Sequence, residues 1–92
     1  MSNVMETRHR RGRALRAWRN DMGIRLRDLG IECGDARGGQ LQKFEMGQRE
    51  LPLPLATRVS QHTEIPLCDL LSPAQVVLAR RVFALLARDA AA

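Results

Sequence analysis

The chain has 92 residues, of which 45% are hydrophobic and 27% charged, the composition of one small globular domain. Its length excludes a large catalytic domain, and no apolar run approaches the roughly 20 residues that a membrane-spanning helix needs. The first residues lack the apolar segment of a secretory signal, so we expect a cytoplasmic protein that is not a disulfide scaffold.

Positive charge is concentrated in the first half of the chain. Fifteen Lys and Arg residues stand against ten Asp and Glu residues, a net charge of +5. Residues 1–49 carry eleven of the basic and six of the acidic side chains, whereas residues 50–92 carry four of each. A GC-rich genome accounts for the preference for arginine over lysine, but not for this uneven distribution. The asymmetry favours a polyanionic partner for the N-terminal half.

Apolar residues recur at helical spacing along the whole chain, whereas period-2 alternation is confined to a run with two prolines. We therefore predict an all-α fold. A basic N-terminal arm over residues 1–12 is expected to precede the first helix. The predicted helices cover 13–22, 25–33, 36–46, 53–63, a short segment that begins at Pro66, and 72–89.

One side of each predicted helix carries apolar residues that should face a common core. In the first four helices these are Leu15, Trp18, Met22, Leu26, Leu29, Cys33, Leu41, Phe44, Leu55, Ala56 and Val59. Gly23, Gly34 and Gly47 stand where the first three helices should end. Asp35 is predicted to cap the start of the third helix.

The last predicted helix, over 72–89, has the clearest start signal in the chain. Ser72, Pro73 and Gln75 stand at the N-cap, N1 and N3 positions of a capping box. On a helical wheel, one half of this helix carries Leu78, Ala79, Val82, Phe83, Leu85 and Leu86. The other half carries Arg80, Arg81, Arg88 and Val77. The apolar half either packs on its own domain or pairs with a second copy of the chain, and we favour the second copy.

No catalytic or metal-binding motif is present in the sequence. Cys33 and Cys68 have no Cys or His at the spacing of zinc ligands, so both are expected to be small buried hydrophobes. His9 lies in a strongly basic segment, and His62 has no evident carboxylate to orient it as a base. We therefore expect neither enzyme activity nor a cofactor.

Residues 15–71 carry a series of short motifs. They are Leu15-Arg-Ala-Trp-Arg19, Gly23-Ile24, Leu26-Arg-Asp-Leu29, Leu41-Gln-Lys-Phe-Glu45 with Gly47, Ala56 with Val59, and Ile65-Pro-Leu-Cys-Asp-Leu-Leu71. Together they resemble the Cro/phage-repressor type of helix-turn-helix domain, the XRE family, over about 57 residues. The resemblance implies a five-helix domain over 13–71 that presents its third helix to the DNA major groove, with an additional amphipathic helix after it.

Two features depart from that family pattern. Gly30 stands where the family usually has alanine, and the interval from Leu29 to Leu41 is one residue longer than usual. The extra residue is expected in the turn before the third helix. DNA contacts at the start of that helix are therefore assigned only to within one residue.

The resemblance also implies roles for individual polar residues. Base edges would be read from the first turn and outward face of the third helix, by Arg37, Gln40, Gln42 and Lys43. Phosphates would be held beside the two helices by Arg25, Arg27, Gln48 and Arg49. Glu45 matches a family glutamate that is mainly structural. The N-terminal arm has two open interpretations. It either enters the minor groove of DNA or is a disordered tail with loose attraction to DNA. The arginines of this arm are Arg8, Arg10, Arg11 and Arg13.

The pair Gly38-Gly39 also has two interpretations. Each glycine costs about 1 kcal/mol relative to alanine inside a helix. Either the absent side chains let the helix backbone approach DNA closely, or the turn extends to Gly39 and the helix starts late.

These expectations converge on a sequence-specific regulator that binds a palindromic operator in double-stranded DNA, as a repressor of its own or a neighbouring operon. Dimerisation is assigned to residues 72–92, through Leu78, Val82, Phe83, Leu85 and Leu86. The alternative is an antitoxin or another protein-binding module that binds DNA together with a partner protein. In that alternative the last helix is the surface for the partner, and no membrane is involved in either case.

Overall fold

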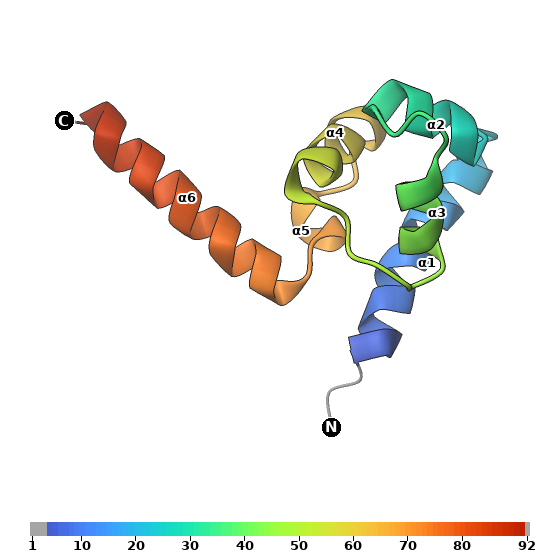
Figure 1. Ribbon diagram of the computed structural model, residues 1–92, viewed down its shortest axis with the longest axis horizontal. Coiled ribbons are helices and arrows are strands. Elements are labelled where there is room, and N and C mark those ends of the chain that lie inside the picture. Colours follow the sequence, from blue (N-terminus) through green and yellow to red (C-terminus); the bar gives the residue numbers. More distant parts are fainter. Residues whose placement is uncertain (1–3, 92) are drawn as a thin grey trace.

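A computed structural model of the chain describes residues 4–91, with side chains from 7 to 88. Its elements in chain order are α1 (Val4–Met22), α2 (Leu26–Cys33), α3 (Gly39–Glu45), α4 (Leu53–Thr63), α5 (Leu67–Leu70) and α6 (Pro73–Ala91). The predicted all-α fold is confirmed, since residues 4–91 contain no strand. Helices α1 to α5 gather into one group, and α6 extends away from it (Figure 1).

The core is formed by apolar side chains from α1, α2, α3, α4 and α5 and from the segments beside them. Its buried members are Leu15, Leu29, Cys33, Leu41, Phe44, Leu51, Leu55, Ala56, Val59, Leu70 and Leu71. The predicted inward faces are therefore largely confirmed. Met22 is the exception, because it is the last residue of α1 and is 60% exposed, while Ile24 packs against the core just after it.

The first helix is longer than predicted, and the predicted arm over 1–12 is wrong for residues 4–12, which belong to α1. Residues 1–3 of that arm lie outside the described residues. The cationic helix is stabilised by a carboxylate distant in sequence. Arg8 and Arg11 lie one turn apart and both contact Glu50, with nitrogen–oxygen distances of 2.9 and 2.7 Å. Arginine is also a good helix former.

Gly12 is the point where α1 crosses the end of α3. A Cβ atom there would lie 2.3 Å from the carbonyl oxygen of Phe44 and 2.6 Å from that of Glu45. Only a residue without a side chain permits this approach between two backbones. Gly12 therefore sets the distance between α1 and α3.

The first turn of α6 has the predicted capping box. The Oγ atom of Ser72 accepts from the backbone N–H of Gln75 at 3.2 Å, and the backbone N–H of Ser72 donates to Oε1 of Gln75 at 2.9 Å. Beyond this turn Val76 packs on the core and Ala79 is buried. Within residues 4–91, none of the helices has the length and hydrophobicity to cross a bilayer.

The two cysteines differ. Cys33 is fully buried in the core, as predicted, and burial raises the pKa of its thiol. Cys68 is exposed, so the prediction of a buried position for it is wrong. The reason is that α5 has one turn, whose inward position is taken by Leu70.

Candidate nucleic-acid interface

The turn between α2 and α3 spans residues 34–38, and α3 begins three residues later than predicted. Asp35, which is 8% exposed, accepts through Oδ2 from the backbone N–H groups of Gln40 and Leu41, both at 3.0 Å. It therefore satisfies two free donors of the first turn, although Gly38 occupies the N-cap position. Gly38 has a φ of +69°, a left-handed backbone conformation that favours glycine.

Gly30 and the long turn form one packing arrangement. A Cβ atom on Gly30 would lie 2.4 Å from the carbonyl oxygen of Asp35 and 2.9 Å from the backbone of Gly38. The turn folds back onto α2 at this residue, and Asp35 donates its N–H to the Gly30 carbonyl at 2.7 Å. Glycine at position 30 therefore permits this turn to pack directly on α2.

Polar side chains cover the outward face of α3. Leu41 and Phe44 are buried, whereas Gln40, Gln42 and Lys43 are exposed. Arg37 is exposed too, but it lies in the turn and not in the helix, because α3 starts at Gly39. Gly39 has nothing within 4 Å of the place where its Cβ atom would lie. The helix starts late, as one of the two interpretations expects, but the turn extends to Gly38 and Gly39 is the first residue of α3.

Four further polar residues flank α2 and α3. Arg25 precedes α2, Arg27 lies in its first turn, and Gln48 and Arg49 follow α3. All four side chains are exposed, and within residues 7–88 none of them forms an ion pair or a hydrogen bond. The three arginines leave positive charge uncompensated on both sides of α3.

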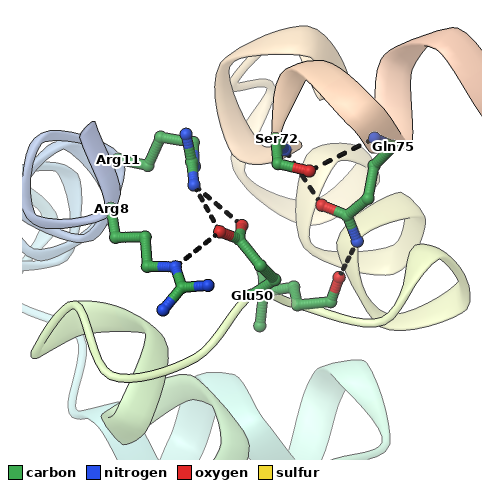
Figure 2. Close-up of polar contacts among 6 residues, drawn as sticks. Arg8, Arg11, Glu50, Ser72 and Gln75 are labelled. Carbon is green, nitrogen blue, oxygen red and sulfur yellow. Dashed lines mark hydrogen bonds and ion pairs between the residues drawn. The ribbon is translucent and has the colours of Figure 1, made fainter. Parts of the chain in front are cut away.

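The segment that carries Gln48 and Arg49 is held from two sides (Figure 2). Glu50 accepts at Oε1 from Nε of Arg8 and at both carboxylate oxygens from Nη2 of Arg11. On the other side, Nε2 of Gln75 donates to the Leu51 carbonyl at 2.6 Å. These bonds join α1 and the start of α6 to the connection between α3 and α4. The capping motif predicted Gln75, but no sequence pattern indicated Glu50.

The predicted arm arginines therefore have separate positions. Arg8 and Arg11 are tied to Glu50, and Arg11 is only 8% exposed, so the prediction that these two contact DNA as an arm is wrong. The Nε atom of Arg11 is buried without a hydrogen-bond partner among the described residues. Arg10 and Arg13 are exposed, but they also belong to α1 and therefore do not form a flexible arm.

Arg19 and Glu45 link α1 to α3 by two parallel bonds. Nε of Arg19 donates to Oε2 at 2.8 Å and Nη2 donates to Oε1 at 2.9 Å, while Nη1 donates to the Ile24 carbonyl at 3.1 Å. The hydrogen bond to Glu45 raises the pKa of Arg19, although burial opposes the shift. With its carboxylate used in this pair, Glu45 has the structural role expected for it.

No family model, curated protein or solved structure compared with the chain matches it. Within the described part of the chain, no three His, Cys, Asp or Glu side chains are grouped as a metal site requires. Function must therefore be inferred from the polar face of α3, its flanking cations and the exposed face of α6.

Proposed function

We propose that the protein is a sequence-specific double-stranded DNA-binding transcriptional regulator that acts as a homodimer. The observation that carries this proposal is the polar outward face of a short helix packed on the core through Leu41 and Phe44, with unpaired arginines on both sides. A helix placed in this way fits the major groove, about 12 Å wide. Two short helices, α2 and α3, joined by a turn support a helix-turn-helix arrangement for this proposal.

Base recognition in this proposal comes from side chains with suitable donor and acceptor geometry. Arg37 can donate two bonds to guanine O6 and N7, and Gln40 or Gln42 can bridge adenine N6 and N7. Lys43 donates to guanine acceptors. Arg25, Arg27, Gln48 and Arg49 would hold phosphates and set the register without selecting sequence.

The exposed face of α6 supports a dimer. Leu78, Val82, Phe83, Leu85 and Leu86 are between 43% and 68% exposed in the single chain. In the single chain only the start of α6, through Val76 and Ala79, packs on the core, and the rest of this face stays uncovered. Two-fold pairing through this face would match a palindromic operator, whose half-sites lie about 34–36 Å apart.

The same face supports the alternative of a partner protein, with DNA binding only in the complex. The two functions differ in what the chain does alone. A homodimer that binds operator DNA without any other protein is expected here. A chain that stays monomeric and binds DNA only after addition of a partner supports the alternative.

Base reading and phosphate binding predict different effects of mutation. Arg37→Ala or Gln40→Ala should relax the preference at one position of each half-site by about 1–3 kcal/mol. Arg49→Ala should weaken binding to all sequences alike and lower the salt slope by about one. Binding to a series of half-site substitutions separates these effects, with Arg81→Ala on α6 as the control. A uniform loss from all three variants would mean that α3 does not read the bases.

Gly39 allows a direct test of close approach to DNA. Gly39→Ala should raise the free energy of unfolding by about 0.4–1 kcal/mol, because the site is open and the helix gains a better former. Operator affinity should fall if the backbone lies against DNA there. Gly38→Ala is the comparison, since its φ of +69° makes alanine destabilising. Unchanged operator affinity in a stabilised Gly39→Ala protein would exclude the close approach.

A further inference from the structure

A groove runs between α1, α3 and the first turn of α2, on the side of α3 that carries Gln42. It encloses about 610 Å³ and its polar lining comes from His9, Arg13, Arg16, Arg19, Gln42 and Glu45. Leu26 and Met46 complete its border. The groove thus adjoins a predicted base-reading residue and the start of α2.

The charges in this groove do not cancel. Glu45 is the one carboxylate in the lining, and both of its oxygens are used by Arg19. The third donor of Arg19 is used by the Ile24 carbonyl. Arg13 and Arg16 lie three residues apart on α1, are exposed, and form no ion pair within residues 7–88. Two complete guanidinium groups are therefore free to bind an anion.

We infer that Arg13 and Arg16 form a further phosphate site for the DNA backbone at the edge of the major groove that α3 enters. This inference rests on the proposed DNA-binding function, and it adds residues of α1 to the interface. It also replaces the minor-groove arm, because Arg13 belongs to a helix and lines a groove next to α3.

The chemistry of the groove favours backbone phosphate over bases. A guanidinium offers a planar fork that matches a phosphate with two bonds. A helix in the major groove has a sugar–phosphate strand on each side of it. The groove is bordered by Leu26 of α2 and by Gln42, Glu45 and Met46 of α3 and its end. Arg13 and Arg16 would therefore bind a backbone phosphate on the side of α3 that carries Gln42.

The decisive measurement is the salt dependence of operator binding by the full chain. The double variant Arg13→Ala/Arg16→Ala should make the slope of log K against log salt less steep, by about 0.9 for each arginine and each bound chain. Its order of preference among half-site substitutions should stay as in the wild type. The control Arg80→Ala/Arg81→Ala removes the same charge from α6 and should leave the slope unchanged. Arg13→Lys/Arg16→Lys should restore the slope, because charge is kept while the fork is lost.

An unchanged slope in the alanine double variant, with a normal helical spectrum, overturns this site and leaves the proposed function standing. A slope lowered equally by the α6 control also overturns it, since the effect would then be one of overall charge. If the wild type binds no duplex at all, the proposed function fails and this site fails with it. If the wild type binds without sequence preference, the slope still decides for or against the site.

Discussion

Replacing Val82 and Leu86 with aspartate is expected to give a monomer that keeps its helical spectrum and binds the full operator about 10²–10⁴-fold more weakly. Both side chains are exposed in the single chain, at 43% and 58%, so the substitutions remove no contact within the core. Each apolar side chain covered by a second copy contributes about 1.5–3 kcal/mol, and a buried charge opposes association. A monomer engages one half-site at a time and loses the gain from linked binding.

Sedimentation, circular dichroism and operator titration of the same samples test this prediction. The matched control is Val77→Asp/Ala84→Asp, which adds the same two charges to the arginine-bearing face of α6, where both residues are exposed. This control should remain dimeric. An unfolded Val82→Asp/Leu86→Asp protein would show that α6 closes the core, and a wild-type monomer at tens of micromolar, the order expected of weak dimers, would contradict the dimer.

Arg19→Ala should lower the free energy of unfolding by about 3 kcal/mol, a large fraction of the stability of a small domain. The substitution leaves the Glu45 side chain, which is 7% exposed, without its partner in α1. The cost arises from a carboxylate that stays buried without compensation and not from the loss of a surface pair. Thermal unfolding should occur more than about 10 °C lower than in the wild type.

Two variants define the cause of that loss. Arg16→Ala makes the same substitution on an exposed residue of the same helix and should change stability by no more than about 0.5 kcal/mol. Arg19→Met/Glu45→Met removes both charges and should recover most of the loss, because an apolar pair replaces the ion pair. An Arg19→Ala protein as stable as the wild type would show that the Arg19–Glu45 pair contributes little to holding α1 on α3.

Much of this fold follows from local pattern. The segment 53–63 was predicted with the bounds that α4 has, because Leu55, Ala56 and Val59 recur at helical spacing after Pro54. The capping box at Ser72 and Gln75 is likewise a local signal, and its two hydrogen bonds are present. The exposed polar residues of α3 were predictable for the same reason, since Leu41 and Phe44 define the opposite face.

The remainder depends on contacts between distant residues. Residues 4–12 were predicted as an arm because they carry many arginines and few apolar residues, but Glu50 pairs with two of those arginines from 39 and 42 residues away. Gly12 permits the close crossing of α1 with α3, a contact that local sequence does not reveal. The start of α3 was misplaced because Gly38, and not Asp35, occupies the N-cap position, while Asp35 accepts from Gln40 and Leu41 across the intervening turn.

The most direct test of sequence-specific DNA binding is to let the purified chain select its binding sites from a pool of random duplexes at near-physiological salt. We expect enrichment of palindromes whose half-sites are centred about 10–10.5 base pairs apart, or a multiple of that spacing. We also expect that Arg37→Ala enriches sites with a changed base in each half. Duplexes recovered without any common sequence, at an affinity equal to that for random DNA, would contradict sequence-specific binding.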